Sequence, residues 1–377
     1  MTPNVEPLSL SELEGVDRQD RLSFGDVQPI LKSVGISRIA DITGLDRLGV
    51  PVAQAVRPGA RSNTVSQGKG LTLDAAMTAA VLEAVETWAA ERVLEQTTTR
   101  PNALKILKSN DFSKALHDGL GSVPDDLSIS ATSATNLSNG ESVHIPTALI
   151  DTDYRVDQSP EADLFRRSTT GLGAGASLAS ATLHALLECV ERHVATDTKT
   201  FNKMNVNQGP ETENRVYGLT QTLIERDVAV GIWLATPHTD ISVARVMIQD
   251  RKPGPDQLLA PAVGTAADCD PSKSIERAVL EAIQTRVSVI AGSREDITRR
   301  HYAHTMADHR DALAMIDAPG EDINLDKCEP TTVDRVLKAI DDMKLGPIFG
   351  VTLLNEPSIP LSVVRVVMPN AKWAAHE

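Results

Sequence analysis

Three short segments of the chain repeat one arrangement of acidic and apolar residues. They are residues 82–86 (LEAVE), 187–191 (LECVE) and 280–284 (LEAIQ). Residues three apart share one face of a helix, so Glu83 and Glu86 are expected to lie side by side at the border of an apolar stripe. Two carboxylates about 4 Å apart repel each other by about 4 kcal/mol when the effective dielectric constant is about 20. A fold that repeats this pair is therefore expected to supply cations to it.

Grouped carboxylates of this kind are typical of sites that hold metal-bound phosphates. Mg²⁺ is usually bound by a few carboxylates together with the phosphates of a substrate. A single acidic pair is more typical of a solvated helix face, so the prediction depends on the three copies. At the last position of the third copy, Gln284 either limits the charge of the cluster or hydrogen-bonds a nucleotide.

A glycine-rich segment, residues 66–70 (SQGKG), precedes the first acidic copy. Gly70 and a second glycine, Gly175, each lie thirteen residues before the first glutamate of the acidic copy that follows. A glycine loop that opens a helix can bind phosphate through backbone N–H groups, the helix N-terminus and a lysine charge. A Walker A loop is excluded, because it needs Ser or Thr after its lysine and Gly70 follows Lys69 here. A flexible turn with a solvated lysine is the alternative.

Three arginines lie next to the acidic copies. They are Arg192, Arg277 and Arg286. Beside a carboxylate, an exposed arginine often forms only a surface ion pair, which contributes about 0–1 kcal/mol. Beside a triphosphate, it would act as a bidentate clamp that stabilises developing charge.

Composition and charge restrict the class of protein. The 377 residues are 41% hydrophobic and 23% charged, as in soluble globular proteins. The net charge of −14 argues against nucleic acid or an anionic membrane as the main partner. No apolar run approaches the roughly 20 residues that span a bilayer. The polar N-terminus is unlike a secretory signal, which predicts a cytoplasmic location, and the three cysteines indicate neither a disulfide framework nor a zinc site.

The elements that must position these residues follow from hydrophobic periodicity. Long helices are predicted around the first two acidic copies, and the third helix is expected to begin at Asp270-Pro271, a strong helix start. The predicted ranges are 72–96 and 177–198 for the first two helices, 49–56 and 144–151 for strands, and 97–145 for a polar insertion with a helix near its start.

Two later regions, residues 214–249 and 332–368, each predict a helix followed by a β-hairpin. The second strand of each hairpin contains the motif S-V-x-R-V. The predicted strands are residues 228–234 and 241–248 in the first hairpin and 347–354 and 361–368 in the second. Together with the long helices, these units predict an α/β sandwich of mixed or antiparallel sheet with internal pseudo-repeats.

Taken together, these motifs resemble the YcaO family of ATP-dependent peptide-modifying enzymes. The matching pieces are S-Q-G-K-G, L-E-A-V-E, S-T-T-G-L-G-A-G with L-L-E-C-V-E-R, D-P-x-x-S-I-E-R-A-V-L-E-A-I-Q-T-R and G-S-R-E-D. They run in family order between residues 40 and 296. Residues 41–52 (DITGLDRLGVPV) are further similar to the subgroup that works with a TfuA-type partner protein.

The resemblance implies a fold in which helix carboxylates, rather than a P-loop, hold ATP and Mg²⁺. It also implies that the oxygen of a peptide-backbone amide is phosphorylated, that a nucleophile attacks the amide carbon, and that phosphate leaves. An adjacent Cys, Ser or Thr side chain would give an azoline ring, and external sulfide would give a thioamide. The expected organisation is a polar leader at residues 1–35 and a YcaO-like catalytic domain at 36–377, which could divide into lobes at 36–200 and 201–377.

Position by position, the resemblance also implies the roles of the site residues. The implied metal ligands are Glu83, Glu86, Glu188, Glu191 and Glu281. The implied ATP-binding residues are Ser66, Lys69, Glu83, Glu86, Glu188, Arg277, Glu281 and Gln284. The implied catalytic residues are Arg192, Arg286 and Glu191.

Three positions depart from the family pattern: Thr87 stands where Arg is frequent, His193 where Asp is frequent, and Asp268 where His is frequent. Residues 368–377 also lack the Pro-rich ending of azoline-forming relatives. We therefore expect a thioamide in a ribosomally made precursor peptide. An azoline-forming cyclodehydratase and a nucleotide-binding accessory protein are the alternatives. Because no leader-binding domain is evident, a TfuA-like or leader-binding partner is expected, and a homodimer is one assembly that the sequence allows.

Overall fold

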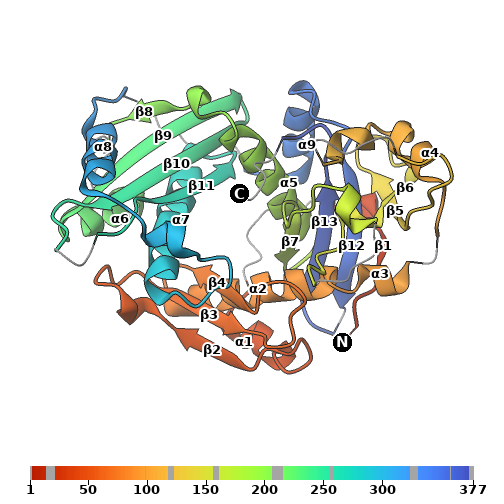
Figure 1. Cartoon of the computed structure of the whole chain (residues 1–377), viewed down its shortest axis with the longest axis horizontal. Coiled ribbons are helices and arrows are strands. Elements are labelled where there is room, and N and C mark those ends of the chain that lie inside the picture. The colour runs from red at the N-terminus through yellow and green to blue at the C-terminus, as the bar shows by residue number, and fades with distance from the viewer. Residues whose placement is uncertain are drawn as a thin grey trace.

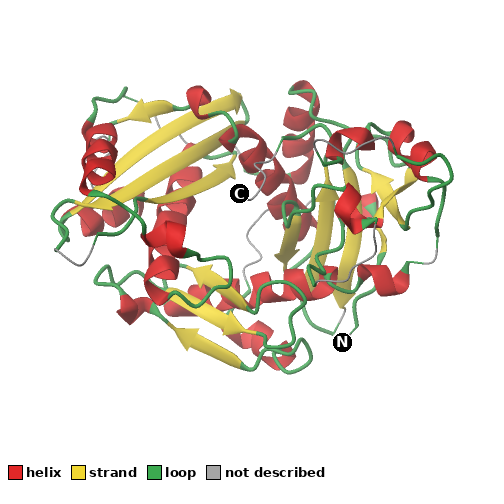
Figure 2. Ribbon diagram, in the orientation of Figure 1, coloured by secondary structure: helices red, strands yellow, loops and turns green. Residues whose placement is uncertain are grey.

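The computed structural model describes residues 2–13, 22–97, 99–117, 123–155, 161–205, 215–254, 258–322, 330–356 and 358–372. Within these ranges the chain forms three β-sheets with helices packed on them (Figures 1 and 2). Neighbouring strands in all three sheets are antiparallel. The predicted α/β fold of antiparallel sheet and long helices is therefore confirmed.

Each sheet combines strands from different parts of the chain. The largest contains β1 (Glu6–Pro7), β5 (Ala131–Asn136), β6 (Ser142–Pro146), β7 (Leu172–Gly175), β12 (Phe349–Glu356) and β13 (Leu361–Val367). Its order is β6-β5-β12-β13-β7, with β1 paired to β12. A second sheet has the order β11-β10-β9-β8, and its strands are β8 (Asn202–Met204), β9 (Val228–His238), β10 (Ile241–Asp250) and β11 (Ala262–Asp268). The third, of order β2-β3-β4, consists of β2 (Arg38–Asp41), β3 (Val52–Val56) and β4 (Val65–Lys69).

The three long helices that contain the acidic copies form as predicted. They are α2 (Leu73–Ala90), α5 (Leu178–Ala195) and α7 (Pro271–Ala291). The side chains of Thr72, Ser177 and Asp270 each cap one helix by accepting an N–H group from its first turn. The helix predicted over residues 72–96 ends at Ala90, and a separate helix, α3 (Val93–Gln96), follows it.

Both predicted helix–hairpin units are present. Helix α6 (Arg215–Ile224) precedes β9 and β10, and α9 (Val333–Asp342) precedes β12 and β13. The other helices are α1 (Phe24–Val27), α4 (Ala103–Ser109) in the predicted insertion, and α8 (Met306–Asp317). Among the described residues, no helix is both long and apolar enough to cross a membrane.

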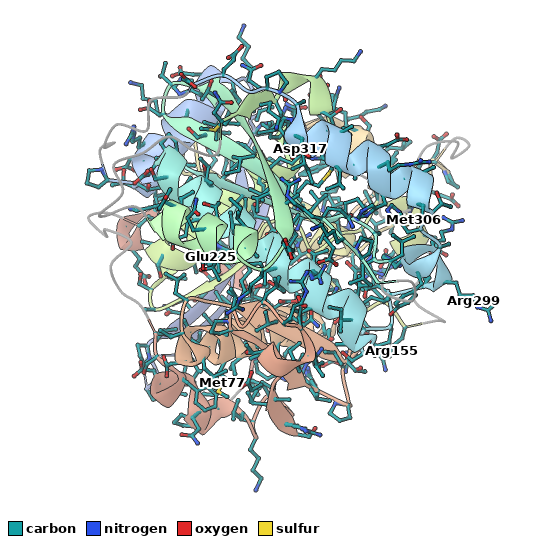
Figure 3. The ribbon with its side chains drawn as sticks, turned by 90° about the vertical axis from the view of Figure 1, so that its left-hand side faces the viewer. Met77, Arg155, Glu225, Arg299, Met306 and Asp317 are labelled. Atoms are coloured by element: carbon teal, nitrogen blue, oxygen red, sulfur yellow. The ribbon has the colours of Figure 1, made fainter. Side chains whose placement is uncertain are left out.

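The four-stranded sheet is covered on both faces. Apolar side chains of α6 and α7 pack on one face, together with residues such as Val246 and Ala266. The other face meets α8 near Met247 and α5 near Val243. Figure 3 shows α8 from Met306 to Asp317 on this side of the molecule.

The glycine-rich segments are strands rather than the predicted phosphate-binding loops. Gly68 lies in β4 and Gly173 in β7, and Gly264 lies in β11, each on the strand before an acidic helix. A Cβ atom would lie 2.1 Å from the Ala76 carbonyl oxygen at Gly68, 2.3 Å from that of Ala181 at Gly173, and 2.2 Å from that of Ala278 at Gly264. Glycine is needed at these places because the helix backbone packs directly on the strand.

Candidate functional site

The three acidic helices border the centre of the molecule (Figure 1), and their carboxylates act on one another electrostatically. Glu188 of α5 acts on Glu83 and Glu86 of α2, and Glu281 of α7 acts on Glu188 and Glu191. The structure thus brings together five residues that we call the carboxylate cluster: Glu83, Glu86, Glu188, Glu191 and Glu281.

Burial and mutual repulsion raise the pKa of four of these carboxyl groups. Burial raises the pKa of Glu83 and Glu188, and nearby cations offset part of that effect. Burial, followed by repulsion from Glu188 and Glu83, raises the pKa of Glu86 well above its usual value. Burial and then repulsion from Glu281 raise the pKa of Glu191 to about 7. A bound cation would offset this repulsion, so the cluster has the electrostatic character of a cation site.

The last residue of each acidic copy hydrogen-bonds the strand that precedes the next acidic helix. Glu86 of α2 accepts a backbone N–H of β7 at 2.7 Å. Glu191 of α5 accepts the hydroxyl hydrogen of Thr265 in β11 at 2.6 Å. Gln284 of α7 donates its amide N–H to the carbonyl oxygen of Gln67 in β4 at 3.3 Å. The three strand–helix units are therefore linked in a closed ring.

This ring gives a physical reason for the glutamine in the third copy. The partner of Gln284 is a carbonyl oxygen, which needs a hydrogen-bond donor. A carboxylate has no hydrogen to donate and would face that oxygen with a negative charge. The sequence suggested that Gln284 limits the charge of the cluster or hydrogen-bonds a nucleotide. Neither interpretation included a hydrogen bond from Gln284 to the protein backbone.

We predict that Gln284→Glu destabilises the folded protein by about 1–3 kcal/mol, because the new carboxylate and the Gln67 carbonyl would both be acceptors. Urea unfolding at pH 8 measures the change. Glu86→Gln is the matched control, since its amide oxygen still accepts the N–H from β7 and one repelling charge is removed. A Gln284→Glu variant as stable as the parent would contradict the proposed role of this bond.

The third acidic copy is displaced along its helix relative to the other two. In α2 and α5 the first glutamate of the acidic copy comes seven positions after the residue that the strand glycine touches, Ala76 or Ala181. In α7 the touched residue is Ala278, and Glu281 comes only three positions after it. Four residues correspond to about one helical turn. The spacing within each copy, seen in the sequence, does not reveal this offset, because it depends on where the strand glycine touches the helix.

Cations lie among the carboxylates of the cluster. The closest approaches are 3.1 Å for Lys69 to Glu281, 3.7 Å for Arg192 to Glu188, and 3.8 Å for Arg294 to Glu83. Lys69 and Arg192 were expected near the site. Arg294 was not among the predicted site residues, although the G-S-R-E-D piece of the family pattern contains it; it also pairs with Asp296 in its own loop at 2.6 Å. Within the described residues the buried Nε of Arg192 has no hydrogen-bond partner.

Ser66 lies on the face of its strand opposite to that of Lys69. Alternate side chains of a strand point to opposite faces. Ser66 shares a face with Gly68, which packs against α2, whereas Lys69 points to the other face and reaches Glu281. The prediction treated residues 66–70 as a loop, in which this alternation would not apply.

Arg286 is also not brought to the cluster. Its guanidinium is buried and pairs with Asp46 at 2.7 Å and with Asp250 at 2.8 Å. These two carboxylates raise the pKa of Arg286 against the effect of burial. These ion pairs join α7 to Asp46 and to the end of β10, and the catalytic role of Arg286 stays a prediction.

Arg277 and the three departures from the family pattern have partners within the protein. Arg277 donates to the Ala267 carbonyl oxygen at 3.1 Å and lies 3.6 Å from the buried carboxylate of Asp268. The side chains at the departing positions bond as follows: Thr87 with Arg57 at 3.2 Å, Asp268 with Thr331 at 2.9 Å, and His193 with the backbone N–H of Lys372 at 3.0 Å. Each departure therefore has a local structural partner.

Comparison with known proteins identifies the fold and its cofactors. A family model described as YcaO cyclodehydratase, ATP- and Mg²⁺-binding, matches residues 67–372. The chain belongs to the YcaO family. A Rhizobium leguminosarum bv. trifolii relative, described as an uncharacterized protein in the tfuA 3′ region, is 30% identical and covers 92% of this chain and 86% of its own. This relative supports the assignment to the TfuA-associated subgroup.

Further matches agree with this assignment. An uncharacterized protein of Methanothermobacter thermautotrophicus is 28% identical and covers 92% of this chain and 91% of its own. The structure of YcaO from Methanopyrus kandleri bound with AMPPCP and Mg²⁺ superposes with a TM-score of 0.67 at 20% identity, over 92% of this chain and 90% of that one. A heterocyclase in complex with substrate and cofactor gives a TM-score of 0.73 at 19% identity, over 98% of this chain and 55% of that one. ATP and Mg²⁺ are the ligands of this YcaO domain.

The carboxylate cluster fits a metal ion that is shared with phosphate. Within the described ranges, no group of three or more His, Cys, Asp or Glu side chains is arranged to hold an ion alone. Mg²⁺ in nucleotide sites typically uses one or two carboxylates, with phosphate oxygens and water as its other ligands. Separated carboxylates whose pKa values are raised by burial and by mutual repulsion meet that requirement.

Nucleotide-bound Mg²⁺ is expected to bind more weakly as the pH falls through about 7, the pKa of Glu191. Binding needs the ionised carboxylate, so the affinity at pH 6 should be about tenfold below that at pH 8. Calorimetric titration of the protein with Mg²⁺-AMPPCP at the two pH values measures this affinity. The same proton has the opposite effect on the free protein: folding raises this pKa, so folded-state stability rises as the pH falls from 7 towards the usual carboxyl value.

The matched control for this pH dependence is Glu191→Gln, which keeps an acceptor for Thr265 and removes the titrating group. Any pH dependence that remains in this variant belongs to the nucleotide or to other groups. Equal pH profiles for the parent and Glu191→Gln would contradict the assignment of the titration to Glu191.

Proposed function

We propose that this chain uses ATP and Mg²⁺ to replace a backbone amide oxygen of a ribosomally made precursor peptide with sulfur. In the overall reaction ATP phosphorylates the amide oxygen, hydrosulfide attacks the amide carbon, and the oxygen leaves as phosphate. The carboxylate cluster in a YcaO chain is the observation that most supports ATP-dependent chemistry.

The cluster and its cations would hold the nucleotide and metal. We assign the metal-binding carboxylates to Glu83, Glu86, Glu188, Glu191 and Glu281. Lys69 lies at 3.1 Å from Glu281 and would exchange this ion pair for a phosphate oxygen. Arg192 has a buried Nε without a hydrogen-bond partner among the described residues, so it retains a donor for a transferring phosphate.

Two observations favour external sulfide over a protein thiol. Burial raises the pKa of Cys189 to about 12 and that of Cys269 to about 11. Neither thiol would ionise near neutral pH, and the thiolate is the nucleophilic form. Cys328 lies outside the described residues. The relative from the tfuA 3′ region supports a separate TfuA-like protein as the partner that supplies sulfur or peptide, which we place with this enzyme in the cytoplasm.

An azoline-forming cyclodehydratase is the second candidate, favoured by the description of the family model. Mass spectrometry of a candidate precursor peptide, after co-expression with this chain and a TfuA-like protein, separates the two products. Exchange of oxygen for sulfur adds roughly 16 Da, and ring closure removes roughly 18 Da. A loss of roughly 18 Da would replace the thioamide proposal with cyclodehydration. An unmodified peptide would leave the nucleotide-binding accessory protein as the function.

A further inference from the structure

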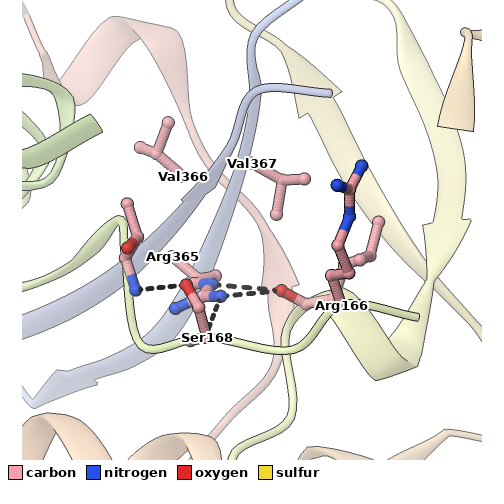
Figure 4. A pocket seen from close by; sticks show the side chains of 7 residues that line it. Arg166, Ser168, Arg365, Val366 and Val367 are labelled. Carbon is pink, nitrogen blue, oxygen red and sulfur yellow. Dashed lines mark hydrogen bonds between the residues drawn. The ribbon is translucent and has the colours of Figure 1, made fainter. Parts of the chain in front are cut away.

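The S-V-x-R-V motif places an arginine at the same point of two hairpins, and the two arginines have different surroundings. Arg365 of β13 is buried and donates hydrogen bonds of 2.7–3.2 Å to the carbonyl oxygens of Leu149 and Ser168 (Figure 4). Arg245 of β10 forms no hydrogen bond or ion pair with any described residue. Burial lowers the pKa of Arg245, and no neighbouring charge acts against that effect.

Arg245 belongs to a row of side chains that crosses the four-stranded sheet. The register places Arg245 opposite Thr265 of β11 and opposite Trp233 of β9, and Trp233 opposite Lys203 of β8. Directly opposed residues project from the same face of a sheet. All four are partly exposed. We call this row the Arg245 strip.

Helices cover the apolar residues on both sides of the strip. On one side Val243 and Ala267 pack with side chains of α5. On the other side Met247 packs with Ile316 of α8. The Arg245 strip is therefore a partly exposed row, polar except for Trp233, between two covered apolar rows.

The strip ends at the carboxylate cluster. The hydroxyl of Thr265 donates to Glu191 at 2.6 Å, so the last residue of the strip touches the predicted metal site. At the other end, Lys203 donates to the carbonyl oxygens of Ile316 and Ala318 and is thereby satisfied. Among the described residues, Arg245 is left as the cation of the strip without a partner, in a chain whose net charge is −14.

We propose that the Arg245 strip holds the peptide substrate beside the carboxylate cluster, and that Arg245 pairs with a carboxylate of that peptide. The proposal rests on the proposed peptide-modifying function. A carboxylate suits the site because a guanidinium binds it through two parallel hydrogen bonds. A nucleotide phosphate suits it less, because the cations that lie within 4 Å of the cluster are others, such as Lys69 and Arg192.

The test uses immobilised full-length protein with Mg²⁺-AMPPCP and three pools of random hexapeptides. The first pool has a fixed central Asp and blocked ends, the second is identical except for Asn, and the third has the Asn and a free C-terminal carboxylate. The parent should retain the Asp pool, the free-carboxylate pool or both about tenfold more than the blocked Asn pool. Arg245→Gln should abolish this preference. Arg251→Gln, which removes an exposed arginine paired with Asp317 just after β10, should leave it unchanged.

The measured affinity for Mg²⁺-AMPPCP separates the possible failures. Arg245→Gln should leave this affinity unchanged, which also shows that the variant is folded. A tenfold loss of nucleotide affinity would place Arg245 in the nucleotide site and overturn the peptide assignment. A parent that binds Mg²⁺-AMPPCP but retains all pools equally would overturn the peptide site alone. A parent that prefers carboxylate peptides but does not bind the nucleotide would overturn the proposed function alone.

Discussion

Replacing Glu188 with glutamine should lower the rate of ATP turnover by about a hundredfold, which corresponds to about 3 kcal/mol of lost stabilisation of the metal and its phosphates. Glu188 lies at the middle of the cluster, where it acts on both carboxylates of α2 and is acted on by Glu281. The substitution removes its charge but keeps an acceptor for the N–H of Gly171, now bonded at 3.0 Å. Phosphate release measured in the presence of the peptide and partner tests the prediction.

The same variant should be more resistant to heat than the parent when no ligand is bound. Burial raises the pKa of Glu188, so its charged form opposes folding, and glutamine removes that charge. A higher melting temperature together with a loss of turnover is expected where repulsion between carboxylates lowers the stability of the protein but is needed for its activity. Glu225→Gln, an exposed carboxylate at the end of α6, serves as control and should change neither quantity. Full turnover in Glu188→Gln would contradict the assigned role of the cluster.

The sequence predicted the acidic helices well because their signals are local. The helix start at Asp270-Pro271 and the apolar periodicity around the acidic copies depend on residues within a few turns of one another. The glycine-rich strands were missed because their signal is not local. Gly68 and Gly173 are required by contact with a helix backbone, and a sequence shows the glycine without showing whether it supplies space or a positive φ.

The site was predicted in part for the same reason. Which acidic residues gather could be inferred from three similar copies, but which face of a strand or helix each basic residue occupies could not. Ser66 lies three residues before Lys69 and Arg286 lies five residues after Glu281, yet both point elsewhere. Arg294 comes from a loop beyond α7 and reaches Glu83. The ring of hydrogen bonds made by Glu86, Glu191 and Gln284 could not be predicted from the sequence. It depends on how the three strand–helix units are arranged relative to one another in space.

The largest expected loss of stability lies outside the site, in the buried pair of Arg57 and Glu91. The guanidinium of Arg57 donates to both carboxylate oxygens of Glu91 at 2.6 Å, and both side chains are almost fully buried. Glu91 also accepts the backbone N–H of Arg61 at 2.8 Å and of Ser62 at 2.9 Å. Glu91→Leu would leave the Arg57 charge buried without its carboxylate partner, and we expect the free energy of unfolding to fall by about 3–5 kcal/mol.

Urea unfolding of Glu91→Leu, Arg57→Met and the double variant measures this effect and its origin. If the cost comes from the unpaired charge, the double variant should be more stable than Glu91→Leu, because it buries no charge there. It should not regain the full stability of the parent, since the N–H groups of Arg61 and Ser62 would still lack their acceptor. A loss below about 1 kcal/mol in Glu91→Leu would mean that water reaches Arg57 and that the pair contributes no more than a surface ion pair. Arg57 also donates a hydrogen bond to Thr87, which lies one helical turn after Glu83 and departs from the family pattern. The same arginine therefore holds both Thr87 and Glu91, the residue that ends α2.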